Sequence, residues 1–334
     1  MVNWHDTMYP KRILLTGASG CIGHYIADGL IHNTPHELFL LVRNPQKLQF
    51  DYEARPGITI LQADLREIER HSRLLKTMDS AILTATAWGG TQEVFDVNLV
   101  KTIRLMNLLD PDVCQQVIYF STASILGRDN RPLRQAGELG TDYIRSKYMC
   151  HQQLSKLAIA PRITTLFPTL VFGGDSNKPY SHLSSGIHEI VKWRKLIRFL
   201  RAEGSFHFMH GYDIAQVVLH LLEHPPSPDE PRELILGNAP LTVNQAVKEL
   251  CAYLKTRVYF GVPLTKQLTE LLITVFRIQV AAWDRFCLQY RHFTYQNPIS
   301  PATYGITPYC ATLTELLQVS GVALSQRPKR KPEK

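Results

Sequence analysis

The sequence has few cysteines, no CxxC pair and no long apolar run. Six cysteines are scattered over 334 residues, and isolated cysteines in apolar surroundings are typical of reduced, buried thiols. No stretch has the roughly 20 apolar residues of a bilayer-spanning helix, and the N-terminus lacks the basic-then-apolar pattern of a secretory signal. We therefore expect a cytoplasmic protein without a disulfide framework or a metal site.

The positive charge of the chain is not gathered with aromatic residues into one block. The formal net charge is +8, and part of it lies in the basic sequence 327–334. We interpret this tail as solvated and disordered. Nucleic-acid binding requires basic and aromatic residues on one folded face, and we predict no nucleic-acid partner.

Strand-like and helix-like segments alternate through the first half of the chain. Apolar runs of strand length occupy residues 13–15, 37–42, 58–61, 80–84, 116–120 and 163–167. Helical patterns lie at about 22–32, 94–109 and 141–157. This alternation predicts right-handed crossovers and an α/β fold with a doubly wound parallel sheet.

The pattern loosens after residue 175, which predicts two lobes. We expect a first domain over 1–175, its sheet completed by later segments near 205–240. A smaller mixed α/β substrate lobe is expected over 176–326, before the tail 327–334.

Apolar residues recur at helical spacing over 264–293. This stripe favours a helix packed on the second lobe. The alternative is a helix that docks on a membrane surface or a protein partner, because Ile273, Ile278 and Val280 widen its apolar face. A homodimer is left open by the sequence.

A glycine-rich turn follows the first predicted strand. Gly17, Gly20 and Gly23 stand between the apolar run 13–15 and the helical pattern that begins near Ile22. Such a turn collects backbone N–H groups and the positive end of a helix dipole, the arrangement that holds a pyrophosphate. The spacing of three and three fits the usual dinucleotide fingerprint only approximately.

A phenol and an ammonium group are placed one helical turn apart. Tyr143 and Lys147 share one face of the helix predicted over 141–157. A free tyrosine has a pKa near ~10, and a nearby positive charge favours its phenolate. Tyr143 is therefore a candidate for moving a proton to or from a substrate oxygen.

Polar residues follow the fifth and sixth predicted strands, where an open α/β sheet binds its ligands. They are Ser121, Thr122 and Ser124 after the fifth strand and Pro168-Thr169 after the sixth. Upstream, Asn98 is either a helix-start residue or a polar group buried near the site.

The chain resembles an extended short-chain dehydrogenase/reductase of the NAD-dependent epimerase/dehydratase family over nearly its whole length. Residues 16–23 match the family's TGxxGxxG loop, and Ala63-Asp64-Leu65 match the segment that touches adenine. Residues 166–174, 208–215 and 304–308 are similar to its proline-containing strand, VxDxA segment and C-terminal LGxxP. The catalytic tetrad positions are filled by Asn98, Thr122, Tyr143 and Lys147.

This resemblance implies a Rossmann-type, NAD(P)-binding first domain. It makes Tyr143 the acid/base, with Lys147 lowering its pKa and holding the ribose, Thr122 binding the substrate oxygen and Asn98 ordering a proton-relay water. The implied cofactor contacts are Thr16, Gly17, Ser19, Gly20, Cys21, Ile22, Gly23, Arg43, Asp64, Leu65, Thr84, Ala85, Tyr143, Lys147, Pro168 and Thr169.

Arg43 bears on the choice of cofactor. It follows the second strand, where NAD-preferring enzymes often carry an acidic residue, and an arginine suits the 2′-phosphate of NADP. Lys47 stands close enough in sequence to help. We predict NADP, with NAD as the alternative.

Departures from the family's pattern bear on the substrate. Ala123 and Ser124 stand where nucleotide-sugar dehydratases carry acidic residues after the catalytic Thr, and Phe206-His207 replace the Arg-Asp pair of many nucleotide-sugar epimerases. These changes favour a less charged small-molecule carbonyl or alcohol. Trp88, Ser124, Tyr180 and His182 are the residues that we expect to border its pocket.

Three functions stay open at this point. The first is an oxidoreductase that transfers hydride to or from a carbonyl or hydroxyl substrate. The second is a nucleotide-sugar epimerase that passes through a transient keto intermediate. The third, suggested by the basic tail and the 264–293 stripe, is a non-catalytic NAD(P)-binding assembly or scaffold protein.

Overall fold

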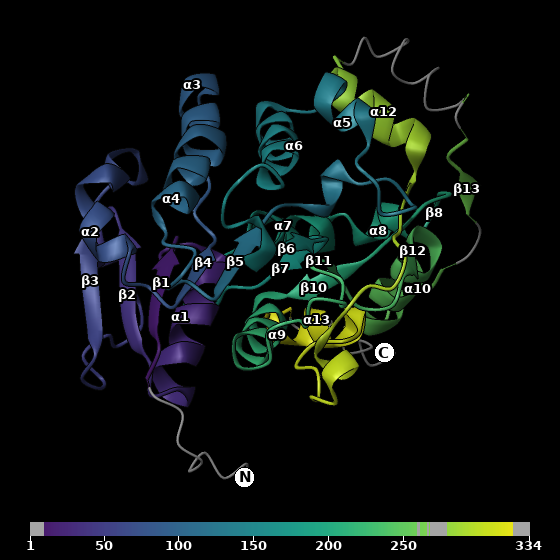
Figure 1. The fold of residues 1–334 in the computed structure, drawn as a ribbon. Helices are drawn as coiled ribbons and strands as arrows, with labels where there is room; N and C mark the ends of the chain where they lie inside the picture. The colour runs from purple at the N-terminus through teal and green to yellow at the C-terminus, as the bar shows by residue number, and fades with distance from the viewer. Residues whose placement is uncertain (1–9, 259–260, 266, 268–278, 323–334) are drawn as a thin grey trace, which may run out of the picture.

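A seven-stranded parallel sheet forms the centre of the molecule (Figure 1). The structure is a computed structural model that describes residues 10–258, 261–265, 267 and 279–322. In the order β11-β6-β5-β4-β1-β2-β3, the strands are β11 (Glu233–Leu236), β6 (Ile163–Pro168), β5 (Gln116–Phe120), β4 (Ser80–Leu83), β1 (Arg12–Thr16), β2 (Glu37–Val42) and β3 (Ile58–Gln62). The predicted α/β class and doubly wound parallel sheet are confirmed.

The strand order reverses between β1 and β4. From β1 the chain runs outward to β2 and β3 and then returns to β4 on the other side of β1. Open sheets bind ligands at the carboxyl ends of the strands that flank such a reversal. The ends of β1 and β4, near Thr16 and Leu83, therefore mark where a ligand site is expected.

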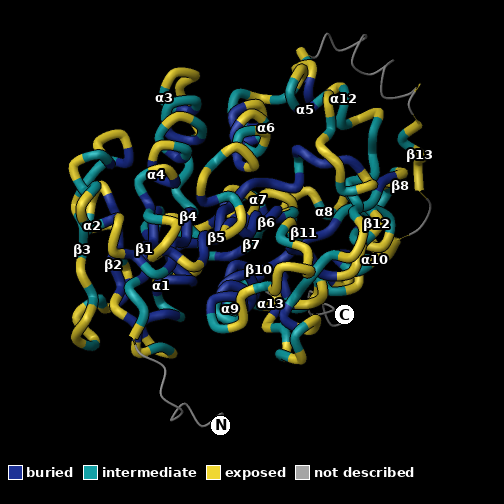
Figure 2. Tube along the Cα trace, viewed as in Figure 1, coloured by how far each residue is buried: buried dark blue, intermediate teal, exposed yellow. Residues whose placement is uncertain are grey.

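Successive residues of the buried strands point to opposite faces of the sheet. Ile13 and Leu15 pack with α1 (Cys21–Asn33) and α9 (Gly211–Glu223), whereas Leu14 packs with helices of the other face. Figure 2 shows the central strands as largely buried. Burial on both faces explains why these strands read as continuous apolar runs.

The helix predicted over 94–109 contains a π-helical turn. It starts as α3 (Thr91–Phe95) and passes through the π-helical segment η3 (Asp96–Lys101) into α4 (Thr102–Leu108). Asn98 lies within this wider turn and is fully buried. The helices predicted over 22–32 and 141–157 correspond to α1 and α6 (Asp142–Leu154).

Shorter elements complete the described part of the chain. The remaining strands are β7 (Leu170–Phe172), β8 (Leu200–Arg201), β9 (Ser205–Phe206), β10 (Phe208–His210), β12 (Leu241–Thr242), β13 (Val262–Pro263) and β14 (His292–Phe293). The remaining helices are η1 (Pro45–Lys47), η2 (Leu65–His71), α2 (Ser72–Leu75), η4 (Ala123–Ile125), α5 (Arg134–Leu139), η5 (Ala160–Arg162), α7 (His182–Lys192), α8 (Arg194–Ile197), α10 (Val243–Tyr253), α12 (Ala282–Tyr290), η6 (Pro301–Tyr304) and α13 (Leu313–Val319). The division into lobes at residue 175 stays a prediction.

The prediction of one continuous helix over 264–293 is wrong in its described part. Residues 279–281 are not helical, and α12 begins only after Ala281, whose backbone is extended. The helix ends at Arg291, whose φ of 62° lies in the left-handed region. Residues 266 and 268–278, and the predicted tail 327–334, lie outside the described residues.

Trp283 shows what α12 packs against. Its side chain is buried in an apolar cluster with Ala136, Ile144 and Phe167. This part of the 264–293 stripe therefore serves packing within the chain.

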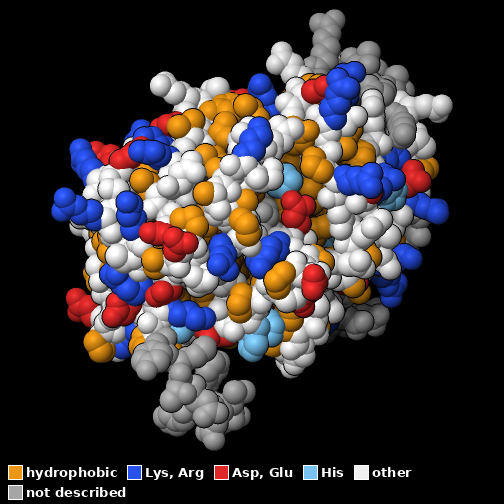
Figure 3. Space-filling model, viewed as in Figure 1, with side chains coloured by type: hydrophobic (Ala, Val, Ile, Leu, Met, Phe, Trp, Pro, Cys, Tyr) orange, Lys and Arg blue, Asp and Glu red, His pale blue; other side chains and the backbone are white. Residues whose placement is uncertain are grey.

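The described surface mixes residue types. On the face drawn in Figure 3, basic, acidic and hydrophobic side chains are interspersed. None of the helices in the described ranges is both long and apolar enough to cross a membrane. Within the same ranges, no three His, Cys, Asp or Glu residues are grouped as metal ligands would be.

Candidate active site

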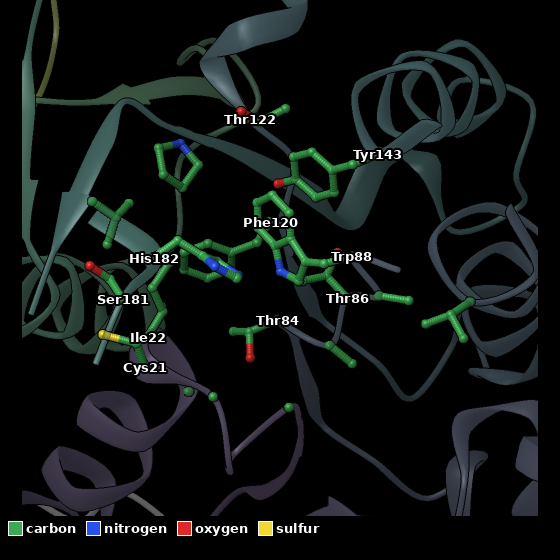
Figure 4. Close-up of a pocket in the computed structure, with 18 of the residues that line it drawn as sticks. Cys21, Ile22, Thr84, Thr86, Trp88, Phe120, Thr122, Tyr143, Ser181 and His182 are labelled. Carbon is green, nitrogen blue, oxygen red and sulfur yellow. The ribbon is translucent and has the colours of Figure 1, made fainter. Parts of the chain in front are cut away.

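A cavity of about 840 Å³ lies at the carboxyl edge of the sheet (Figure 4). It runs from the glycine-rich turn after β1 to α6. The predicted site residues that line it are Gly17, Ser19, Gly20, Cys21, Ile22, Gly23, Arg43, Asp64, Leu65, Thr84, Ala85, Trp88, Thr122, Ser124, Tyr143, Lys147, Pro168, Thr169, Tyr180 and His182. Thr16 and Asn98 do not line the cavity.

The glycine turn brings backbone close to backbone. Gly17 has a φ of +78°, and a β-carbon there would lie 2.6 Å from the Ala85 nitrogen. A β-carbon on Gly23 would lie 2.2 Å from the Gly17 carbonyl oxygen. Side chains at these two positions would therefore push α1 away from the ends of β1 and β4.

The N-terminus of α1 has no side-chain cap. Gly20 occupies the N-cap position, and the first N–H groups of a helix have no partner within it. Cys21, Ile22 and Gly23 of this first turn line the cavity. Free N–H groups together with the helix dipole fit the pyrophosphate of a dinucleotide.

Thr16 acts behind the cavity wall. Its hydroxyl accepts a hydrogen bond from the Ala85 N–H at 3.3 Å, and its carbonyl accepts one from the Thr84 hydroxyl at 2.7 Å. Thr16 is buried, so it fixes the loop after β4 against the glycine turn.

Charged residues gather at one end of the cavity. Arg43, after β2, lies 3.2 Å from a carboxylate oxygen of Glu93, and both side chains are exposed. Lys47 also lines this end. Asp64 accepts two hydrogen bonds from the Arg66 guanidinium, which lower the pKa of its carboxyl group.

Lys147 is buried at the sheet end of α6, with only 2% of its surface exposed. Its Nζ donates to the Phe120 carbonyl oxygen at 2.8 Å and lies 5.0 Å from the centre of the Tyr119 ring. Burial disfavours the charged form and lowers the pKa of Lys147 to about 8.

The Tyr143 hydroxyl points into the cavity (Figure 4). Burial raises the pKa of Tyr143 well above its usual value, and the smaller lowering effect of the Thr122 side chain does not offset it. Desolvation therefore dominates this pKa, and the lowering effect of Lys147 stays a prediction for the protein with its cofactor bound. The phenol is protonated at neutral pH.

Trp88 covers the Tyr143 ring. The two rings stack with centroids 3.8 Å apart and planes 16° apart, and His182 lies 4.6 Å from Trp88 on α7. The loop after β4 therefore covers the Tyr143 ring, and His182 at the start of α7 contacts the covering Trp88.

The side-chain amide of Asn98 is fully hydrogen-bonded. Its Oδ1 accepts from the Ala87 N–H at 2.8 Å and from the Thr86 hydroxyl at 3.0 Å. Its Nδ2 donates to the Ala87 carbonyl at 3.0 Å and to the Ser146 hydroxyl at 3.1 Å. An amide makes four such bonds, so this side chain has no position left for the predicted proton-relay water.

Several lining residues were missed by the sequence argument. The clearest is Trp283, which reaches the cavity from α12 although it is far from the other site residues in sequence. Its only sequence signal was its place in the 264–293 apolar stripe. Periodicity shows that such a residue is buried, but not against which element. Leu183, Phe120 and Ile144 are further examples.

The end of the cavity near Tyr143 is apolar and aromatic. Trp88, Tyr180, Leu183 and Trp283 line it. Among the described residues, the charged side chains of the cavity wall are Lys147, which is buried, and the group at the other end, namely Arg43, Lys47, Asp64 and Glu93.

Comparison with known proteins gives a family. Residues 13–237 match the model of the NAD dependent epimerase/dehydratase family. Quinone oxidoreductase 2 of Escherichia coli (strain K12) is 28% identical over 127 residues. That alignment covers 38% of this chain and 41% of the relative, so the match spans less than half of the relative's length.

Two solved structures share the fold. UDP-glucose 4-epimerase of Thermotoga maritima, solved with UDP-glucose, is 16% identical with a TM-score of 0.59. A mutant UDP-glucuronic acid 4-epimerase of Bacillus cereus, solved with a fluorinated UDP-sugar and NAD, is 17% identical with a TM-score of 0.62. Each alignment covers 92% of this chain and 97% of the other. At such identity the likeness concerns the fold alone.

Proposed function

This chain belongs to the NAD-dependent epimerase/dehydratase family, and we propose that it is an NADP-dependent oxidoreductase acting on an uncharged carbonyl or hydroxyl substrate. One observation carries the proposal. A protonated phenol, Tyr143, faces an apolar cavity end that Thr122 also lines. The same cavity begins at the uncapped N-terminus of α1.

The residues present fit a dinucleotide. The close approach at Gly17 and Gly23 leaves the first turn of α1 open to a pyrophosphate. The cavity continues from there to the charged end near Arg43 in one direction and to Tyr143 in the other. The adenosine would lie at the charged end and the nicotinamide near Tyr143.

Proton transfer falls to Tyr143. When bound, the nicotinamide ring supplies or accepts the hydride at the substrate carbon. In the reducing direction the Tyr143 hydroxyl gives its proton to the carbonyl oxygen, and its raised pKa keeps that proton available at neutral pH. The Thr122 hydroxyl, which lines the same cavity, would bind that oxygen. Lys147, held by the Phe120 carbonyl, provides a fixed positive charge behind them.

Arg43 and Lys47 support NADP as the cofactor. Both lie at the charged end, where the Arg43 guanidinium can form a bidentate ion pair with a 2′-phosphate. Glu93 competes for Arg43. We expect Arg43→Ala to weaken NADPH binding about tenfold more than NADH binding, and Glu93→Gln to strengthen NADPH binding. Equal effects of Arg43→Ala on the two nucleotides would favour NAD.

The apolar cavity end supports an uncharged substrate. A nucleotide sugar carries a pyrophosphate that needs cationic partners, and no exposed cation lines this end among the described residues. His207, in the Phe206-His207 pair that stands where many nucleotide-sugar epimerases carry Arg-Asp, is buried. Its Nδ1 contacts the Asn238 carbonyl and its Nε2 accepts the Tyr295 N–H. Both ring nitrogens are thus engaged.

Tyr143→Phe tests the proposal. NADPH oxidation would be followed with a panel of quinones and aromatic and aliphatic ketones. We expect the variant to lose about 10²- to 10⁴-fold in rate while NADPH still raises its melting temperature. Tyr148→Phe, on the same helix but outside the cavity, is the matched control.

Two results would overturn the proposal. Unchanged turnover in Tyr143→Phe would remove Tyr143 as the proton donor. A protein that keeps its cofactor bound and interconverts nucleotide sugars without net redox change would be an epimerase, the alternative left open by the sequence.

A further inference from the structure

The outer side of α7 and α8 exposes a row of large apolar side chains. Ile190, Trp193 and Leu196 are 50%, 60% and 64% exposed. Leu200 follows them on β8 and pairs with the exposed Val262 of β13. In Figure 1, α8, β8 and β13 lie together at the right of the molecule. We call these five residues the α7–α8 surface.

Packing among the residues that the structure describes does not account for this surface. The inner side of the same helices already supplies Ile187, Val191 and Ile197 to an apolar cluster with Leu250 and Leu317. An amphipathic surface helix has one apolar face, and this segment has two. Contiguous exposed apolar side chains of this size mark a contact surface.

The charge around this surface is mainly positive, with the exposed Glu189 and Glu203 at its two ends in the sequence. The sequence 190–202 contains five basic residues and no acidic one. Arg194 and Lys195 follow Trp193, and the exposed Arg201 follows Leu200. Lys192 is paired with Glu189. Apolar side chains that include a tryptophan, interleaved with long basic side chains, are typical of helices that lie in a bilayer interface.

We propose that the α7–α8 surface binds the surface of an anionic lipid bilayer. The apolar side chains would enter the headgroup region while Arg194, Lys195 and Arg201 meet lipid phosphates. A symmetric contact with a second copy fits less well, because it would bring the basic side chains of the two copies together.

Helix α7 connects this surface with the cavity mouth. Tyr180, His182 and Leu183 line the cavity, and α7 starts at His182. A docked protein would hold this mouth beside the bilayer, where apolar carbonyl compounds concentrate. That consequence rests on the proposed function; the lipid binding itself does not.

Vesicle co-sedimentation of the full chain tests the proposal. Phosphatidylcholine vesicles, with and without phosphatidylglycerol, are the probe. We expect binding to the anionic vesicles that weakens in high salt. Arg194→Gln with Lys195→Gln should weaken it roughly 30-fold, and Ile190→Ser/Trp193→Ser/Leu196→Ser should abolish it.

A matched control removes apolar side chains elsewhere. Val100 on η3 and Val113 after α4 are exposed, and Val100→Ser/Val113→Ser should bind vesicles like the unmodified protein. Equal melting temperatures would establish that the variants are folded. The proposal is overturned if the protein binds anionic vesicles no better than neutral ones and the triple change does not weaken that binding. It is equally overturned if the triple change dissociates a dimer and leaves vesicle binding intact. Neither result depends on turnover, so failure here is separate from failure of the proposed reaction.

Discussion

Replacing Lys147 by methionine should change how stability depends on pH. The Lys147 ammonium is buried, and its pKa is lowered to about 8 from the ordinary value of 10.5 by desolvation. Methionine keeps a long, unbranched side chain without the charge. It also leaves the Phe120 carbonyl without its 2.8 Å partner, so the stability at one pH mixes two effects.

The pH dependence separates these effects. Between pH 8 and 10.5 the unfolded chain still holds a proton that folded Lys147 has released, so the free energy of unfolding rises with pH across that window. The full pKa shift corresponds to about 3.4 kcal/mol, since one pKa unit is worth about 1.36 kcal/mol. Roughly 2.5 kcal/mol of this should appear between about pH 7 and 10.

Urea unfolding at a series of pH values measures the difference directly. From about pH 7 to 10, the free energy of unfolding of the unmodified protein should rise by about 2.5 kcal/mol relative to that of Lys147→Met, because other titrating groups are common to both proteins. Lys156→Met, an exposed lysine just beyond α6, should give a curve parallel to the unmodified protein. Parallel curves for Lys147→Met would show that folded Lys147 has an ordinary pKa, and the burial argument would fail.

Three further changes test the site. Gly23→Ala should lower the melting temperature and abolish its rise with NADPH, because the new β-carbon would lie 2.2 Å from the Gly17 carbonyl, whereas Gly186→Ala, with open space around it, should do neither. Asn98→Ala should lower the free energy of unfolding by about 2–4 kcal/mol in urea titrations, since buried partners lose their bonds. Trp88→Ala should expose Tyr143 and lower its pKa, so that phenolate absorbance develops at lower pH than in the unmodified protein; an unchanged titration would refute the burial effect.

The sheet and the glycine turn were predictable because their signals are local. Buried parallel strands such as β1 need continuous apolar runs, and a turn with the contacts of Gly17 tolerates no side chain. Both constraints are visible in the sequence, as apolar runs at the strands and glycines at the turn. The ends of these strands then fixed which residues meet at one edge.

Features that depend on distant packing were not predictable. The π turn at Asn98 leaves an ordinary helical pattern, because only one hydrogen-bond offset changes. Trp283 reaches the cavity through the docking of α12, which periodicity does not encode. The direction of the Tyr143 pKa shift depends on how tightly Trp88 and the protein around it exclude water, whereas the spacing to Lys147 suggested the opposite direction.

The bonding of Asn98 has a consequence for how specificity can diverge in this protein. The Asn98 amide hydrogen-bonds both to the loop that carries Trp88 and to Ser146, whose hydroxyl donates to the Tyr143 carbonyl. The stacked rings of Trp88 and Tyr143 therefore form a rigid wall of the cavity. A second part of the cavity wall is not hydrogen-bonded to that amide. It consists of His182 and Leu183 of α7 and Trp283 of α12. Substitutions that change substrate choice should therefore accumulate in this second part of the wall, while the first part keeps Tyr143 in place for proton transfer.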